Sequence, residues 1–271
     1  MSRRIFAPPL IWLLLYCLSL AANAADQTEL TLLSKPVAVT ATLARADSGD
    51  FMARISVHSG PIAHVVNTFV AGESSTTAVA EQKLRQFVQM RGPYVLVSEL
   101  CFGNAWRCNS VAVFKAAGDV IKRMGDFIGN LDGVVHDGHL YDVYDKLEQN
   151  VDGVSHAASP VFTVVLDDDN NALLVNAMQT WQVNQPMWNS NADLLATLKP
   201  GNNWLPADWE RYLSALVTNA ALARYCQRQG ELQSLLAETE SRLDVLHRRA
   251  LTDALSKVIP LEVPKAWRHS N

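Results

Sequence analysis

The stretch YVLVSELCFGNAWRCNSVAVFK, residues 94–115, predicts a β-hairpin and therefore an antiparallel sheet. Its two flanks are rich in valine, leucine and phenylalanine, which fit the pleated surface of a strand. Between the flanks, Gly103-Asn104 supplies residues that are typical of a turn. Cys101 and Cys108 lie on either side of this turn, and their role depends on the compartment that the chain reaches.

The N-terminal residues predict export. Arg3 and Arg4 form a short positive region, an apolar run follows from Leu10 to Leu20, and Ala22-Asn23-Ala24 fits a signal peptidase. The apolar run is shorter than the roughly 20 residues that a helix needs to span a bilayer. We therefore expect a signal peptide over residues 1–24, and a periplasmic mature protein that is not embedded in the membrane.

In an oxidising compartment, two cysteines that flank a tight turn are expected to form a disulfide. A zinc site would require two further ligands at suitable spacing, and a redox pair more usually reads Cys-x-x-Cys. We therefore expect a disulfide between Cys101 and Cys108. Cys226 is the remaining cysteine of the mature chain, and we expect it to be buried and unreactive, with intermolecular pairing as the alternative.

Short strand patterns occupy the first part of the mature chain. Apolar residues alternate or run together there, and Pro36, residues 47–50 and Gly60-Pro61 interrupt them. These interruptions separate four expected strands, at residues 28–34, 37–44, 52–59 and 63–70.

Residues 78–91 have apolar side chains at a spacing closer to that of a helix than of a strand, and Gly92-Pro93 ends the segment. A second β region follows from Tyr94 to about Met178, with hairpin signals at 117–119 and 167–171. The sequence thus predicts an antiparallel β domain over residues 25–200 with one helix near 78–91.

From Pro206 onward, apolar residues recur at steps of three and four, which is typical of helices. We expect a helical pair over residues 201–260, broken at Gly230 and packed on the β domain, with one long helix as the alternative. Residues 261–271 form a tail. The predicted fold class is α+β, a mainly antiparallel β domain followed by a C-terminal helical hairpin.

The charge of the chain is acidic and unevenly distributed. The formal net charge of −4 becomes −6 without residues 1–24, which contain two arginines and no acid. This acidic charge argues against nucleic acid as a partner, because phosphate binding requires a basic surface. Residues 132–169 contain nine acids and one base, Lys146, and they predict an acidic binding face for a basic protein. The face comprises Asp132, Asp137, Asp142, Asp145, Glu148 and Asp152.

The same region resembles a known family. The stretches YVLVSELCFGNAWRCNSVAVFKAAGDVIKRMGDF, LYDVYDKLEQN and SHAASPVFTVVLDDDNNALL resemble the FG-GAP/VCBS-like β repeats of bacterial secreted proteins, over about residues 92–180. The resemblance implies a blade-like antiparallel sheet and a binding role rather than catalysis. Of the family's calcium-type loop, Asp132 and Asp137-Gly138 are the positions that match, and residues 167, 169 and 171 independently have the spacing of calcium ligands.

Several histidines have spacings that catalytic or metal sites use. His136 and His139, with Asp137 or Asp142, could hold a metal ion, and His156 could act as a general base. Histidines in polar loops are more commonly structural, however, and the nucleophile-elbow, Walker, dinucleotide-binding and His-Glu-x-x-His motifs are absent from the sequence. We therefore predict no metal, no cofactor and no catalytic residue.

Tryptophans offer a different kind of site. Trp181, Trp188 and Trp204 lie close in sequence to several asparagines and to Trp209. Exposed aromatic rings beside amide groups can stack on sugars and bind their hydroxyls. The alternative is that these rings fill the joint between sheet and helices.

The sequence favours an exported, non-catalytic periplasmic protein, an inhibitor or immunity factor that engages a basic protein through its acidic face. A cell-envelope glycan hydrolase or glycan-binding protein is the alternative, with cell-wall glycan as its ligand. Enzymatic activity is not expected from the motifs, although no two of the many acids can be singled out as a catalytic pair.

Overall fold

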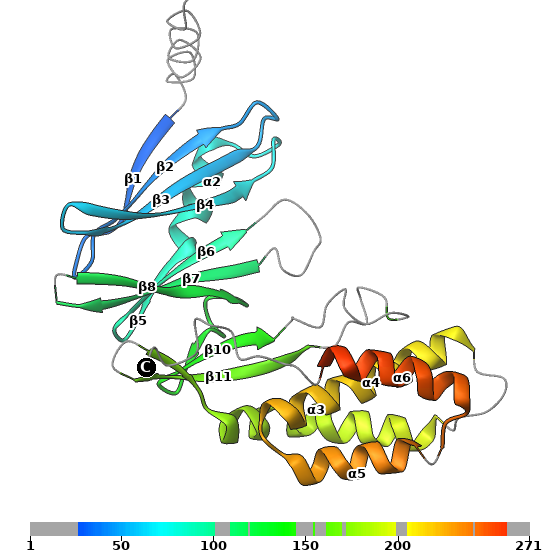
Figure 1. Ribbon diagram of the computed structural model, residues 1–271. Coiled ribbons are helices and arrows are strands. Elements are labelled where there is room, and N and C mark those ends of the chain that lie inside the picture. Colours follow the sequence, from blue (N-terminus) through cyan, green and yellow to red (C-terminus); the bar gives the residue numbers. More distant parts are fainter. Residues whose placement is uncertain are drawn as a thin grey trace, which may run out of the picture. The chain divides into compact units, whose positions relative to one another are not determined.

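The computed structural model describes residues 27–100, 109–118, 120–144, 154, 161–169, 172–198, 205–240 and 242–258. Three antiparallel sheets come first and helices dominate the C-terminal part, which confirms the predicted α+β fold class (Figure 1). The chain divides into two compact units, and the boundary in the sequence falls between Asp126 and Phe127. The predicted signal peptide and the C-terminal tail lie outside the described residues.

The first sheet confirms the four strands expected before residue 71. Its order is β1-β2-β3-β4, and every neighbouring pair is antiparallel. Along β3 every second residue from Phe51 to Val57 is buried, whereas Met52 and Arg54 are exposed. One face of the sheet is therefore apolar. The strands are β1 (Gln27–Leu33), β2 (Val39–Arg45), β3 (Phe51–Ser59) and β4 (Ile62–Ala71).

The helix predicted over residues 78–91 is shorter in the structure. α2 spans Thr77–Leu84, a 3₁₀ turn follows over Arg85–Phe87, and β5 spans Val88–Arg91. Gly92, with a φ of 57°, makes a tight turn that folds β5 back onto the next strand. Residues 88–91 therefore pair with the next strand, and apolar spacing within the segment alone could not reveal this pairing.

The second sheet contains the hairpin of the opening stretch. β6 (Tyr94–Leu100) pairs with β7 (Asn109–Ala117) so that Tyr94 faces Lys115 and Leu100 faces Asn109. β8 (Val120–Ile128) completes the order β5-β6-β7-β8. Cys101 and Cys108 lie outside the described residues, so their disulfide stays a prediction.

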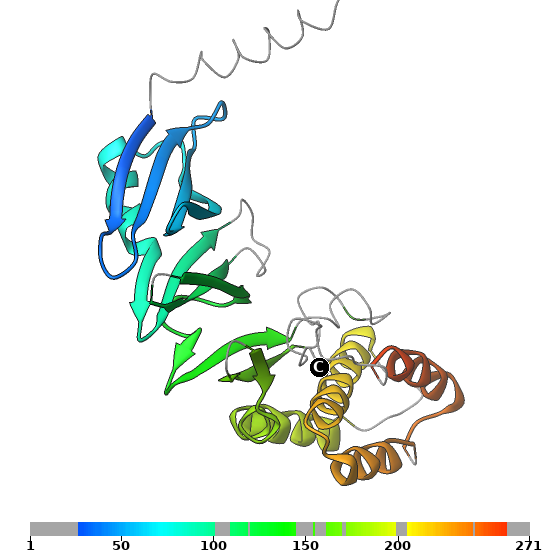
Figure 2. The ribbon, with the colours of Figure 1, turned by 60° about the vertical axis from the view of Figure 1, so that its left-hand side comes forward.

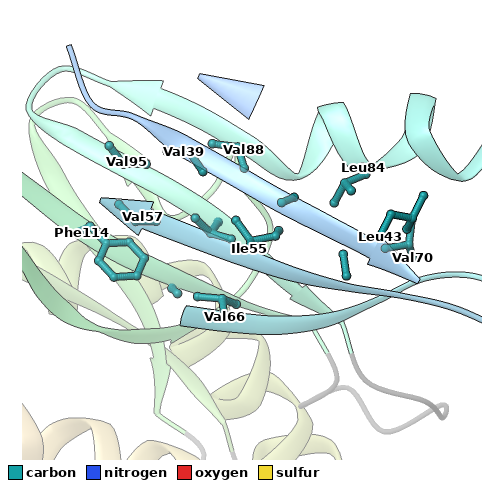
Figure 3. Packing of buried hydrophobic residues seen from close by; sticks show 14 of the residues in the cluster. Val39, Leu43, Ile55, Val57, Val66, Val70, Leu84, Val88, Val95 and Phe114 are labelled. Carbon is teal, nitrogen blue, oxygen red and sulfur yellow. The ribbon is translucent and has the colours of Figure 1, made fainter. Parts of the chain in front are cut away.

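The first and second sheets share one hydrophobic core (Figure 3). Ile55 and Val57 from the first sheet, Phe114 from the second and Leu84 from α2 are each fully buried within it. Residues from β strands and from α2 thus bury their apolar faces together, which is how a two-layer arrangement excludes water.

The third sheet has the order β12-β11-β10-β9. The pairing of β11 with β12 confirms the hairpin signal at 167–171. The strands are β9 (Val135–His136), β10 (His139–Tyr144), β11 (Phe162–Asp169) and β12 (Ala172–Val175).

α3 (Ala177–Thr197) was not predicted from the sequence, where Pro186 and three asparagines weaken the helical signal. It lies against β11 and against the following helix (Figure 2). The third sheet therefore belongs to the same unit as the helices, whereas the sequence had suggested a boundary near residue 200. Tertiary packing compensates for the low helix propensity of this segment.

Three helices, rather than the predicted pair, follow α3. They are α4 (Pro206–Tyr225), α5 (Gln229–Glu240) and α6 (Val245–Val258). The first break comes at Gln227, whose φ is 58°, close to the expected Gly230. The second break was missed, and there the Asp244 side chain accepts the backbone N–H of His247 at 3.0 Å, a typical helix N-cap. Among the described residues, no helix is sufficiently long and apolar to cross a membrane.

Candidate functional site at the end of the third sheet

Four acidic residues gather at one end of the third sheet. β10 and β11 are antiparallel, so β10 begins where β11 ends, and the β9–β10 and β11–β12 turns lie at the same end. From Phe127 to Leu198 the described residues include no lysine or arginine that could neutralise the cluster. We call this cluster the acidic end; it consists of Asp137, Asp167, Asp168 and Asp169.

Asp137 lies at the tip of the β9–β10 hairpin. Asp137 and Gly138 have φ values of 48° and 80°, as a two-residue hairpin turn requires. The Asp137 carboxylate is 3.1 Å from Nε2 of His136, and its side chain is 78% exposed. The turn thus holds a carboxylate out into solvent.

His139 has both ring nitrogens engaged. Its Nδ1 lies 2.7 Å from Oδ1 of Asp167, and its Nε2 lies 3.0 Å from the amide nitrogen of Gln179. Because the Gln179 amide nitrogen can only donate, Nε2 accepts, and the ring proton is on Nδ1. Asn176 donates to the other Asp167 oxygen at 3.0 Å and also caps α3. His139 therefore anchors the start of α3 and offers no lone pair to a substrate.

The predicted histidine metal pair is arranged differently from a metal site. His136 and His139 face each other across the hairpin, but His136 contacts Asp137 while His139 contacts Asp167 and Gln179. Among the described residues, there is no group of three or more histidines, cysteines and acids that could hold a metal ion. His156 lies outside the described residues.

The acids predicted to form a binding face have different environments. Asp132 is exposed in the turn before β9. Asp142 is only 9% exposed, and its Oδ1 accepts the backbone N–H groups of Ile128 and Val143, both at 2.8 Å. This carboxylate therefore holds the chain between β8 and β10. Asp145, Glu148 and Asp152 lie outside the described residues.

Two of the tryptophans considered for glycan stacking pack against protein groups. Trp181 is 7% exposed, and its ring centroid lies 4.9 Å from that of Trp188. The Arg228 guanidinium lies over the Trp181 ring, 5.2 Å from the ring centroid. The neighbouring amides are also engaged: Asn184 binds the Thr163 backbone, and Asn191 donates to Asn219. These groups join the helices to one another and to the sheet.

Trp209 is engaged in the same way. Its ring stacks on Tyr212 at 6.0 Å and meets His247 edge-on at 4.5 Å. Trp204 lies outside the described residues.

A small pocket lies among α3, α4 and α5. Its volume of about 40 Å³ would hold a few water molecules and is too small for a sugar ring. Tyr212 is almost fully buried in its wall, and burial raises the pKa of the Tyr212 hydroxyl. Its lining residues are Ala192, Leu195, Tyr212, Leu235, Glu238, Thr239 and Arg242.

No family model, curated protein or solved structure matches the chain. The site is therefore characterised by its own chemistry: four carboxylates at one end of a sheet, with Asp137 and Asp169 exposed and Asp167 and Asp168 half-buried, next to a histidine whose ring nitrogens are both engaged. The contact of His139 with Asp167, 28 residues apart, was missed by sequence reasoning because only the strand register brings the two residues together.

Cys226, at the C-terminal end of α4, is expected to be unreactive in the folded protein. It is 6% exposed, and burial raises the pKa of its thiol from 9.0 to about 12. The folded thiol therefore stays neutral at pH 8, and only the thiolate reacts rapidly. A disulfide reagent at pH 8 should modify Cys226 in urea but not in buffer.

A Cys226→Ala variant identifies the signal of this thiol, and rapid modification of Cys226 in buffer would contradict its burial. The raised pKa also affects stability at high pH. The unfolded thiol ionises at a lower pH than the folded one. Burial of the neutral thiol therefore contributes its full share of the unfolding free energy below about pH 9, and this share is lost as the pH rises towards 12.

Proposed function

We propose that this protein is an exported, non-catalytic binding protein that engages a basic protein through its acidic end, in the manner of an inhibitor or immunity factor. The observation that carries the proposal is the gathering of carboxylates at one end of the third sheet, with no described lysine or arginine from Phe127 to Leu198. Such a surface attracts cationic partners and speeds their encounter.

The state of His139 supports binding over catalysis. A general base must present an unshared lone pair to the proton that it removes. In His139, Nδ1 is directed to Asp167 and Nε2 to Gln179, so this histidine, which contacts the acidic end through Asp167, is occupied by the fold itself. The carboxylates then act by their charge.

The glycan alternative has less support. Trp181 and Trp209 use their ring faces in contacts with other side chains, and the pocket among α3, α4 and α5 is too small for a sugar ring. An acidic surface is also not what neutral glycan recognition requires, because sugar hydroxyls are bound chiefly by hydrogen bonds and aromatic stacking.

The proposal predicts that removing charge from this region weakens capture of basic proteins. A triple variant, with Asp137→Asn and Asp169→Asn at the acidic end and Asp132→Asn in the turn before β9, keeps side chains of similar size at three exposed positions. Immobilised on beads in envelope extract, it should retain basic proteins several-fold less well than the wild type, because attraction at a distance is lost. High salt should reduce capture by the wild type too. The screening length is about 8 Å at physiological ionic strength, and it becomes shorter as the salt concentration rises.

A matched control removes the same three charges elsewhere. Glu29→Gln, Asp47→Asn and Asp253→Asn change exposed acids that lie outside residues 127–198. This control should retain the same proteins as the wild type, as quantified by mass spectrometry. Equal losses in the two triple variants would show that net charge alone governs capture, and unchanged capture in both would refute the proposal.

A further inference from the structure

β11 is longer than the strand beside it. β12 pairs only with residues 166–169 of β11, through Leu166 facing Val175 and Asp169 facing Ala172. Residues 162–165 pair with β10 on one side, and no described strand lies on the other. An unpaired strand edge presents N–H and C=O groups on which another strand can add.

The side chains of α3 cover this edge. The Val165 N–H donates to Oγ1 of Thr180 at 3.0 Å, and the Thr163 N–H donates to Oδ1 of Asn184 at 3.0 Å. Asn184 also donates to the Thr163 carbonyl at 2.7 Å, and the Asn176 N–H donates to the Val165 carbonyl at 2.9 Å. The edge groups of both strand residues are therefore satisfied by α3 side chains and by the backbone of its N-cap residue, Asn176.

The geometry explains how a helix can take the place of a strand. Residues four apart on an α-helix are separated by about 6 Å along its axis, and residues two apart on a strand by about 6.8 Å. Thr180 and Asn184 therefore keep in step with Val165 and Thr163. The Asn184 amide presents its oxygen and one of its two N–H donors to Thr163, as the peptide groups of a neighbouring strand would.

The covered segment is one that would otherwise associate with itself. Residues 162–166 read FTVVL, with no charge and no proline, and such segments pair readily when their edge is open. Thr180 is fully buried and Asn184 is 4% exposed, so both polar groups are enclosed with the edge that they satisfy.

We infer that Thr180 and Asn184 act as a stand-in strand that closes the β11 edge against pairing with a second copy of this chain. The inference is independent of the proposed function. If the two side chains served only stability, removing their polar groups would lower the unfolding free energy and leave the protein in its original oligomeric state.

The test is sedimentation velocity on the mature protein over a range of concentrations. The variant is Thr180→Val with Asn184→Leu, which keeps the apolar bulk but removes the hydrogen-bonding groups. We expect its self-association constant to exceed that of the wild type by about tenfold or more, with added intermolecular β structure in the infrared spectrum.

The control is Asn191→Leu with Asn219→Leu, which removes a partly buried amide pair that contacts no strand edge. It should lose stability but associate no more than the wild type. If the edge variant also keeps the wild-type association constant, the inference is wrong.

A suppressor distinguishes edge pairing from general unfolding. Adding Thr163→Pro to the edge variant removes the N–H that Asn184 had satisfied, on the side away from β10. It should restore the wild-type association constant, and persistent association would refute an edge mechanism. Should the edge variant fail to fold, Thr180→Val alone uncovers Val165 and is judged by the same measurement.

Discussion

Replacing Phe114 with alanine is expected to lower the free energy of unfolding by about 3–5 kcal/mol. Phe114 is fully buried in the core that the first and second sheets share (Figure 3). Its ring lies 5.6 Å from that of His64, and the Arg123 guanidinium lies 5.7 Å from its centroid. Alanine would remove these contacts and leave a cavity that the two sheets could close only by moving together.

Urea unfolding followed by far-ultraviolet circular dichroism measures this change. Phe114→Leu fills most of the volume and should cost about 1–2 kcal/mol, since it disturbs shape more than size. Met52→Ala, on the exposed face of the first sheet, should stay within about 0.5 kcal/mol of the wild type. Equal effects of Phe114→Ala and Met52→Ala would contradict the shared core.

The strands of the first sheet were readable from the sequence because β2, β3 and β4 each bury apolar residues and β1 alternates exposed with half-buried residues. Apolar residues occupy every second position from Phe51 to Val57, which is the pattern of a strand with one buried face. Gly60-Pro61 marks where the chain reverses. The segment 78–91 was misread for a physical reason: its apolar spacing suits both a helix and a strand, and the choice is made by the ladder that Val88 forms with Val97.

α3 shows what local signals cannot give. Its Pro186 and its asparagines oppose a helix when taken residue by residue. In the fold, however, Asn184 binds the β11 edge, Trp181 packs on Trp188, and Asn191 bonds to Asn219 on α4. Asn184 and Asn191 thus each make a tertiary contact that offsets their low helix propensity, and those contacts cannot be seen until the third sheet and α4 are placed.

The candidate site was partly predictable. The density of acids between residues 132 and 169 could be counted, and Asp137-Gly138 is a strong turn signal. Counting charges could not separate an exposed acid such as Asp137, which lies at a hairpin tip, from a buried one such as Asp142, which lies on the buried face of β10. The sequence also could not show that Asp167 holds His139, because that contact depends on register.

Asp142→Ala is expected to lower the free energy of unfolding by about 2–4 kcal/mol, because the backbone N–H groups of Ile128 and Val143 would lose a carboxylate acceptor within a buried site. Asp142→Asn keeps an oxygen at the same position and should cost no more than about 1 kcal/mol. Both values come from urea unfolding of the intact protein. The contrast between the two variants separates loss of the hydrogen bonds from loss of the charge.

Asp137→Asn provides the matched exposed control and should change stability by less than about 0.5 kcal/mol. The two substitutions should also affect binding differently. Asp137→Asn should weaken capture of basic proteins while folding stays intact, whereas Asp142→Asn should leave capture nearly unchanged. If Asp142→Ala were as stable as the wild type, its carboxylate would not be holding β8 to β10. Asp142 would then be grouped with the exposed acids of the binding face, as the sequence predicts from its charge.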